Sequence, residues 1–428
     1  MALVGIRSLE RTVEFLRSES AYQRDFVQEY VLPRALRAGE NPYRPMGELA
    51  SEVVGHLPSA NVRRHPSAHP PPVVVAFLPL SFMSYERAGL LWFLLELLGL
   101  LLCIRWLAAY CGVQGPGVYA VLTLAAIGLP PVALELVEGQ LGVVTLLLLV
   151  AMWGSLRSGA AVRGGALLGG AVALKLAGWP IMLFLLLKAQ WRSAGAAVAV
   201  FAGLNLAAMV GMGVARVFDY YLHIGPSIVA LYRDDSGNLS AWAIGWHLFA
   251  GTGSAGLSSL RAAPLAALPS LAWSASAVIV VVVLAAAFAW VWRAETVDDW
   301  IGVLVCASVL VNPVVWEHTL ILLAIPVAVI VARLRAAGYP RGPFALLLTI
   351  VGLLIVPYPV WQLIALVWAQ EEPVYGNPAL IPFAFSLPTL IPQLAVTGLL
   401  LFAAWIARRP EKIWRAPGGC SISLSGSS

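Results

Sequence analysis

The segment AGLLWFLLELLGLLLCIRWLAA, residues 88–109, is the first long apolar run of the chain. A transmembrane α-helix needs about 20 predominantly apolar residues to cross the hydrocarbon core of a bilayer, and this run has that length. Further apolar runs follow it almost to the end of the sequence. The segment therefore predicts the first of a series of membrane-spanning helices.

The composition of the whole chain indicates the same class of protein. Of its 428 residues, 60% are hydrophobic and 11% are charged, whereas a soluble domain has about 25% charged residues. Mean hydropathy is +0.83. These values exclude a water-soluble protein and make the bilayer the natural solvent. The net charge of +5 fits the basic excess that membrane proteins keep in cytoplasmic loops, so no nucleic-acid partner is expected.

We expect an all-α, polytopic integral membrane protein with about eleven transmembrane helices. The predicted spans are residues 88–109, 117–134, 140–156, 163–178, 179–189, 193–213, 270–292, 300–317, 318–334, 343–369 and 379–407. The 179–189 segment is too short to cross alone and is expected to borrow length from its flanks.

Basic residues in the short loops predict the orientation of these spans. They fall on one side of the membrane if residues 88–109 run from outside to inside, and the positive-inside rule makes that side cytoplasmic. They are Arg157, Arg163, Lys188, Arg192, Arg293, Arg333, Arg335, Arg341, Arg408, Arg409, Lys412 and Arg415. The N-terminus then lies outside with nothing ahead to carry it across, so we expect a transmembrane helix before residue 1.

This orientation divides the chain into five parts. They are an external segment (1–87), transmembrane helices (88–213), an external loop (214–269), C-terminal transmembrane helices (270–409) and a cytoplasmic tail (410–428). In the first part, apolar residues 73–83 follow a run of prolines and are too short to cross the bilayer. We expect them to form a helix in the interface or only partly inserted.

Two charged residues at the predicted outer face are candidates for chemistry. Asp25 lies in the polar segment ahead of the first span, where a carboxylate could take a proton from a hydroxyl; a solvated loop carboxylate or a helix N-terminal charge is the alternative. Lys175 lies near the outward end of the span 163–178. A cation there is costly and calls for an anionic partner such as a phosphate, unless the lysine only snorkels to the headgroups.

An ordered set of short motifs extends from about residue 22 to residue 335. They are Asp25-Phe26 with Tyr30, Gly39-x-Asn41-Pro42-Tyr43, Pro71-Pro72, Gly139-Gln140, Lys175-Leu176-x-x-Trp179-Pro180 and Asn312-Pro313-Val314-Val315-Trp316-Glu317-His318. Together they resemble the polytopic mannosyltransferases of glycosyltransferase family 87, in the GT-C superfamily. Pro-Val-Val-Trp-Glu-His stands where Pro-x-Ser-Trp-Asp-His is usual in that family, and Thr319 where the family has a second histidine.

The resemblance implies a GT-C fold and a polyprenyl-phosphate-linked sugar donor, typically mannose, used on the outer face of the cell membrane. The sugar would pass with inversion to a hydroxyl of a lipid or glycan acceptor, without a nucleotide sugar, a cofactor or a required metal. Asp25 matches the general base of the family. Tyr43 belongs to one of the shared motifs and is included among the substrate-binding candidates.

Three further candidates lie at predicted outward helix ends. Glu317 and His318 begin a span, where the histidine could bond a phosphate or orient the base, or simply cap a helix at the interface. Gln140 follows Gly139 at a helix junction, where its amide could bond a sugar hydroxyl. A tight turn explains the glycine equally well.

A basic cluster precedes the prolines. Arg63 and Arg64, with His65 and His69, could meet a pyrophosphate or a lipid headgroup. Plain contact with the membrane surface is the alternative, and membrane lipids are expected partners in either case.

No metal site is expected. The pair Asp234-Asp235 has no EF-hand spacing and is more typical of a solvated turn. The four cysteines, Cys103, Cys111, Cys306 and Cys420, show no zinc or disulfide spacing.

Two other functions stay open at this point. A transporter or flippase of lipid-linked sugars would also have intramembrane charges and broken helices. Against it, charge is scarce within the spans, no internal repeat is visible, and the polar residues gather at one face instead of the midplane. A non-catalytic relative of the family is the third possibility.

Overall fold

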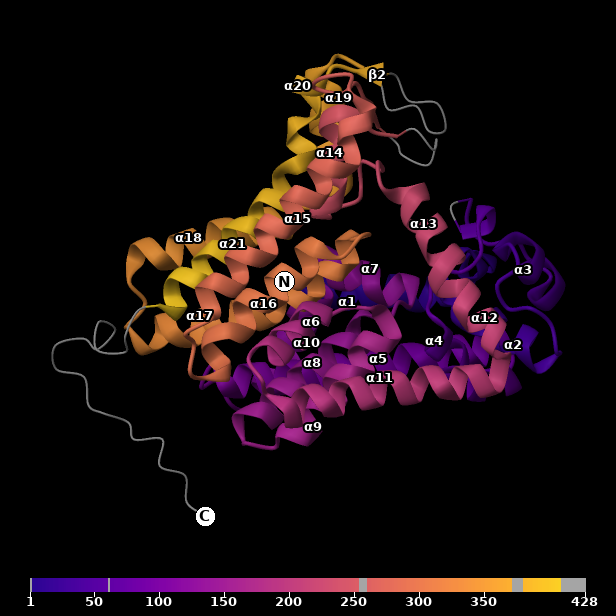
Figure 1. Ribbon diagram of the computed structural model, residues 1–428, viewed down its shortest axis with the longest axis horizontal. Coiled ribbons are helices and arrows are strands. Elements are labelled where there is room, and N and C mark those ends of the chain that lie inside the picture. The colour runs from indigo at the N-terminus through magenta and orange to yellow at the C-terminus, as the bar shows by residue number, and fades with distance from the viewer. Residues whose placement is uncertain (1, 61, 254–259, 372–379, 409–428) are drawn as a thin grey trace.

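The computed structural model describes residues 2–60, 62–253, 260–371 and 380–408, and these are folded almost entirely into helices (Figure 1). The predicted all-α class is confirmed. Some predicted features lie outside the described residues, namely Arg409, Lys412, Arg415, Cys420 and the tail 410–428.

The N-terminal segment consists of short helices that pack against one another. Its elements are α1 (Ala2–Leu16), the 3-10 helix η1 (Glu19–Gln23), α2 (Phe26–Arg37), α3 (Met46–Val54), η2 (Val62–Arg64), α4 (Pro71–Ala76) and η3 (Leu78–Phe82). The apolar residues 73–83 therefore form two short helices instead of one. Val73 and Val74 are completely buried, because α4 packs against α2 and α11 within the protein.

The central part of the chain forms a bundle of longer helices. They are α5 (Tyr85–Tyr110), α6 (Pro116–Ile127), α7 (Pro130–Glu138), α8 (Gly142–Arg157), α9 (Ala161–Lys175), α10 (Trp179–Leu187) and α11 (Trp191–Met212). Helix α9 lies between α8 and α11. It approaches α11 closely because Gly165 and Gly169 have no side chains. A Cβ at either position would overlap backbone atoms of α11. Such packing through small residues is typical of membrane helices.

The second half of the chain adds a further group of helices and a minimal sheet. Its helices are α12 (Val214–Asp219), the π-helix η4 (Tyr220–Ile224), α13 (Gly225–Tyr232), α14 (Ala241–Phe249), α15 (Pro269–Val291), α16 (Val297–Val311), η5 (Glu317–Leu323), α17 (Ala324–Ala336), α18 (Arg341–Leu354), α19 (Tyr358–Trp368), α20 (Phe383–Ser386), η6 (Leu387–Leu390) and α21 (Ile391–Ala407). The strands β1 (Arg261–Ala262) and β2 (Leu380–Ile381) pair in parallel, Arg261 opposite Leu380 and Ala262 opposite Ile381.

Fewer helices can cross a membrane unaided than the sequence predicts. Within the described residues, five helices are long and apolar enough, and two bent pairs raise the number to seven if each pair is one span. The five are Tyr85–Tyr110, Trp191–Met212, Pro269–Val291, Glu317–Ala336 and Phe383–Ala407. The pairs α6–α7 and α18–α19 bend by 80°. Helices α8, α9, α10 and α16 are shorter because the chain turns before it reaches the length of a span.

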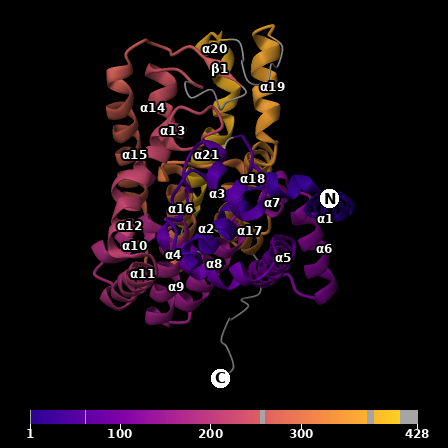
Figure 2. The same cartoon turned by 90° about the vertical axis from the view of Figure 1, so that its right-hand side faces the viewer.

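The predicted basic residues gather at one end of these helices. Arg157 ends α8 and pairs with Asp298 at the start of α16, at 2.9 Å. Arg333 pairs with Asp299, and Lys188 donates to the Trp292 carbonyl at 2.7 Å. The opposite ends of α8, α9 and α16 lead to Gln140, Lys175 and Asn312. In both views α14, α19 and α20 lie at one extremity of the molecule, and α9 and α11 lie at the other (Figures 1 and 2).

Candidate functional site

A large cavity lies at the helix ends that point away from the basic loops. Its volume is about 870 Å³. The titratable side chains in its wall are Asp25, His65, His69, Glu138, Lys175, Asp235, Glu317 and His318, and its larger aromatic residues are Tyr220, Tyr221, Tyr232, Trp316 and Tyr358. A cavity of this size with a few converging polar groups is a typical ligand site.

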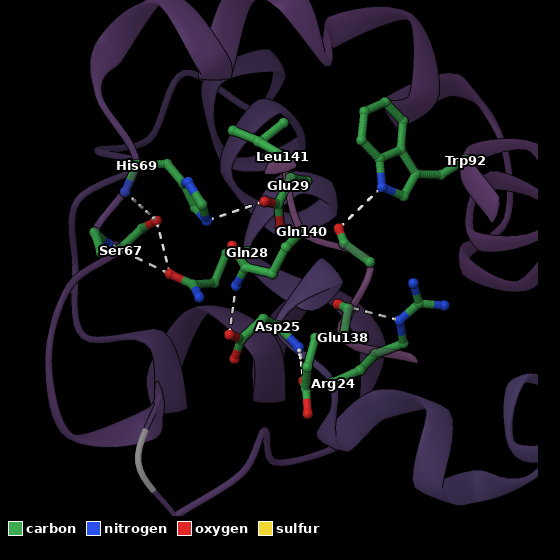
Figure 3. A network of polar contacts seen from close by, with 12 residues as sticks. Arg24, Asp25, Gln28, Glu29, Ser67, His69, Trp92, Glu138, Gln140 and Leu141 are labelled. Carbon is green, nitrogen blue, oxygen red and sulfur yellow. Dashed lines mark hydrogen bonds and ion pairs between the residues drawn. The ribbon is translucent and has the colours of Figure 1, made fainter. Parts of the chain in front are cut away.

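Asp25 lies at the entry to α2, with its side chain in the cavity wall. Its Oδ2 accepts a hydrogen bond from Gln140 Nε2 at 2.5 Å, and its backbone N–H donates to Glu138 Oε2 at 3.0 Å (Figure 3). Although Asp25 has the N-cap position, its side chain makes no capping hydrogen bond. The carboxylate is therefore oriented by the junction between α7 and α8 and not by its own helix.

The turn between α7 and α8 requires a glycine. Gly139 has φ +67°, and a Cβ there would come within 1.9 Å of the Arg24 guanidinium. The Gly139 carbonyl accepts from Trp92 Nε1 at 2.9 Å, which fixes the peptide preceding Gln140. Arg24 is only 1% exposed and stacks over Phe26, 5.0 Å from the ring centroid. The glycine thus makes room for a buried arginine and directs Gln140 toward the carboxylate of Asp25.

The surroundings of Asp25 raise the pKa of its carboxyl above the ordinary value. Burial is the main cause, because low polarity disfavours the charged form, and the nearby Glu29 acts in the same direction. His69, the hydrogen bond from Gln140 and Lys175 oppose the shift. A carboxyl with a raised pKa is a stronger proton acceptor once it is ionised, as a general base requires.

Lys175 is the last residue of α9 and reaches the same cavity. The helix ends there because Leu176 turns into the left-handed region, with φ +52°. The Lys175 ammonium is buried and has no hydrogen-bond partner among the described residues. A buried ammonium without a hydrogen-bond acceptor is unfavourable, so the cavity is suited to an anionic ligand.

Glu317 and His318 line the cavity where η5 begins. Glu317 Oε2 accepts from the Tyr358 backbone N–H at 3.0 Å, which joins η5 to α19. The preceding loop is fixed by Asn238, whose Nδ2 donates to the Pro313 carbonyl and whose Oδ1 accepts from Val315 N–H, at 3.1 and 3.0 Å. Hydrogen bonds from Asn238 therefore hold the Asn-Pro-Val-Val-Trp loop in place, and His318, which follows it, lines the cavity.

The structure brings some predicted site residues together and leaves others outside. Asp25, Gln140, Lys175, Glu317 and His318 all line the cavity. The side chain of Tyr43 lies behind the wall, where its hydroxyl donates to the His69 carbonyl at 2.9 Å.

The two predicted arginines lie away from the cavity lining. Arg63 and Arg64 are exposed on η2, whereas Val62 and His65 at either side of them are buried and line the cavity. The single turn of η2 directs its arginines outward and its flanking residues inward.

Three groups at the site did not emerge from the sequence as functional residues. Asp235 lines the cavity and its neighbour Asp234 is buried, so the expected solvated turn is wrong. Glu138 immediately precedes Gly139-Gln140 and contacts the backbone of Asp25. Tyr232 donates its hydroxyl to His65 Nε2 at 2.7 Å, because His65 Nδ1 faces the Pro66 carbonyl at 2.5 Å and so carries the ring proton. Proximity to a motif could have indicated Glu138; nothing local to the sequence indicates that Tyr232 meets a histidine far upstream.

No metal centre is evident in the part of the chain that the structure describes. No group of three or more His, Cys, Asp or Glu side chains is arranged there to hold a metal ion.

A comparison with protein families matches the central part of the chain. The model of glycosyltransferase family 87 matches residues 68–315, more than half of the chain. A search of curated proteins found no match. The matched region includes His69, Gln140 and Lys175, begins after Asp25, and ends just before Trp316.

Proposed function

Because the chain belongs to glycosyltransferase family 87 and is a membrane-bound glycosyltransferase, we propose that it transfers a hexose, specifically mannose, from a polyprenyl-phosphate donor. The acceptor is a hydroxyl of a lipid or glycan. Asp25 is the general base, and transfer inverts the anomeric carbon. One observation carries the proposal: a positioned carboxylate, Asp25, faces the same cavity as Lys175, whose buried ammonium has no hydrogen-bond partner among the described residues.

These two groups match the two charges that change in such a reaction. The acceptor oxygen forms a bond to the anomeric carbon as its proton passes to Asp25. The bond from that carbon to the phosphate oxygen breaks, and its electron pair leaves the phosphate with one more negative charge. A base is needed for the first change and a cation for the second.

The phosphate of the donor is the ligand proposed for Lys175. A lipid phosphate would supply the hydrogen-bond acceptor that the buried ammonium lacks among the described residues. His318 lies in the same wall and can add a hydrogen bond to the phosphate. Attack from the side of Asp25, opposite the phosphate, accounts for inversion in a single displacement.

The other cavity residues fit the two substrates. Gln140 holds the base by one hydrogen bond, and Glu317 fixes the start of η5 through Tyr358. Trp316 and Tyr232 pack edge to face, 5.3 Å between centroids, in the cavity wall. Aromatic surfaces of this kind suit the apolar faces of a sugar ring or the first isoprene units of the lipid.

The cavity is assigned to the extracytoplasmic face of the cell membrane. The support comes from the basic residues Arg157, Lys188 and Arg333, which lie at the other ends of the helices whose termini line the cavity. Under the positive-inside rule those basic ends are cytoplasmic.

The direct test is a transfer assay in membranes that contain the protein. Radiolabelled polyprenyl-phosphate mannose is supplied as the donor, and labelled lipid or glycan products are separated from it. We expect transfer that depends on the protein and does not occur from a nucleotide sugar. Movement of intact donor across sealed vesicles without any labelled product would contradict the proposal and favour a flippase.

A further inference from the structure

A buried ion pair lies one helical turn from Asp25. His69 Nε2 is 2.9 Å from Oε1 of Glu29, which is on α2 four residues after Asp25 (Figure 3). The side chain of Glu29 is completely buried and that of His69 is 8% exposed. His69 lines the cavity, whereas Glu29 lies behind it. The pair therefore presents its histidine to the ligand and hides its carboxylate.

His69 is the polar partner of the buried Glu29 carboxylate. This carboxylate accepts no hydrogen bond from the described residues, so its contact with His69 is what compensates its burial. An isolated carboxylate in such a site is strongly unfavourable, and the adjacent ring stabilises it. The pairing therefore ties the position of the His69 ring to α2.

The position of His69 is fixed by its own backbone. Its N–H donates to Ser67 Oγ at 3.2 Å, and its carbonyl accepts from Tyr43 at 2.9 Å. The Ser67 hydroxyl in turn donates to Gln28 Oε1 at 2.9 Å, again on α2. The ring is thus held between α2 and the chain that enters α4, which is the arrangement of a preorganised binding group.

His69 and Lys175 reach the base from different elements. His69 precedes α4, and Lys175 ends α9. Both lie close enough to Asp25 to lower the pKa of its carboxyl. A ligand beside the base can therefore meet both groups.

We propose that His69, held in place by its contact with Glu29, is a second binding group for the phosphate of the donor lipid, together with Lys175. This inference rests on the proposed function. As the bond between sugar and phosphate breaks, the phosphate changes from a singly charged diester to a more highly charged monoester. A ring N–H held in this position donates a hydrogen bond to that oxygen, and it binds the leaving group more tightly than the intact donor.

The test measures binding of the leaving group and needs no turnover. The full-length protein in nanodiscs is titrated with a polyprenyl phosphate, with the uncharged polyprenol of the same length, and with inorganic phosphate. The variants are Glu29→Gln, His69→Gln and the double substitution. Glu52→Gln is the matched control, because Glu52 is exposed in the same segment and paired with Arg44 at 2.6 Å.

We expect Glu29→Gln and His69→Gln each to weaken binding of polyprenyl phosphate by about 10- to 100-fold, the usual effect of losing a charged hydrogen bond. The double variant should be no weaker than His69→Gln, because both changes remove the same interaction. Polyprenol binding and the control should be unchanged. His69→Lys should recover part of the phosphate affinity, since lysine supplies N–H donors and a positive charge.

Three outcomes would overturn the assignment. If folded Glu29→Gln protein bound polyprenyl phosphate with wild-type affinity, the contact between Glu29 and His69 would serve only the fold. This isosteric variant tests the role of the pair even if substitutions of His69 prevent folding. Inorganic phosphate bound as tightly as the lipid phosphate would assign the site to free phosphate. Failure of the wild-type protein to bind polyprenyl phosphate would contradict the proposed function itself; binding that the variants share would contradict only the role of His69.

Discussion

Gln140 Nε2 donates a hydrogen bond to Asp25 Oδ2 across 2.5 Å, although the two residues are 115 positions apart in the sequence. The contact depends on Gly139, whose left-handed conformation turns the chain between α7 and α8. One of the two carboxylate oxygens is thereby held in a fixed direction. This relationship converts an aspartate at the entry of a helix into a positioned group in a cavity wall.

We predict that Gln140→Leu lowers sugar transfer without preventing folding. The substitution keeps the approximate volume of the side chain and removes the hydrogen bond to the carboxylate. Hydrogen bonds to charged groups contribute about 1.5–3 kcal/mol, so kcat should fall by about 10- to 100-fold. Gln190→Leu is the control, because Gln190 is exposed at the start of α11. Equal activity of the two variants would remove Gln140 from the site.

The raised pKa of Asp25 predicts a particular pH dependence. A general base works when deprotonated, so kcat/KM should fall as the pH drops through the pKa of Asp25. Burial and Glu29 raise that pKa. The acid limb of the profile of kcat/KM against pH should therefore lie above the ordinary aspartate pKa of about 4. In Gln140→Leu the limb should move to higher pH, because the lost hydrogen bond favours the ionised form. A limb at the ordinary value, unmoved by the substitution, would contradict this assignment.

We predict that Lys175→Met weakens binding of the donor, because it removes a buried cation that the described residues leave without a hydrogen-bond partner. Lys175→Arg should recover only part of the affinity, since arginine keeps the charge but differs in shape and hydration. The apparent donor affinity is measured by titrating polyprenyl-phosphate sugar in the transfer assay. Unchanged affinity in Lys175→Met would mean that the ammonium only reaches for the headgroups.

The sidedness of the site is testable in intact cells. Ser51 is exposed on α3, in the predicted external segment, and Ser158 is exposed just after α8, beside Arg157. With the native cysteines replaced, Ser51→Cys should react with an impermeant thiol reagent and Ser158→Cys should be protected until the membrane is opened. The reverse pattern would place the cavity on the cytoplasmic side.

The motif residues of the sequence come together in the structure, whereas several predicted helices do not have the predicted lengths. Short motifs identify Asp25, Gln140, Lys175 and His318, and the structure brings all four to one cavity. Hydropathy alone cannot show where an apolar run breaks. Leu176 and Gly178 turn the chain between α9 and α10 with positive φ, so the runs on either side form shorter helices.

Tertiary packing determines the features that the sequence could not predict. Arg63 and Arg64 appear equivalent to His65 in a basic cluster, yet the turn of η2 directs only the histidine inward. Glu29 is an ordinary residue of a helical segment until folding brings it to His69. Such pairings join residues distant in the chain and leave no local pattern.

The transfer rate of Asp25→Asn tests the general-base role of this residue most directly. Asparagine keeps the size of the side chain and can still bond to Gln140, but it cannot accept the proton of the acceptor. General-base catalysis contributes about 10²- to 10⁴-fold, so transfer should fall by that factor while the donor still binds. Asp25→Glu should recover little, because displacing the carboxylate by about 1 Å can cost roughly 10²-fold.

The alternative is that Asp25 serves only the start of α2. The absence of a capping hydrogen bond from its side chain is against that role, and asparagine would replace aspartate there with little effect. The decisive measurement is therefore kcat of folded Asp25→Asn protein with saturating polyprenyl-phosphate sugar. If Asp25 is the general base, kcat should fall by about 10²-fold or more. Turnover close to that of the wild-type protein would contradict this role.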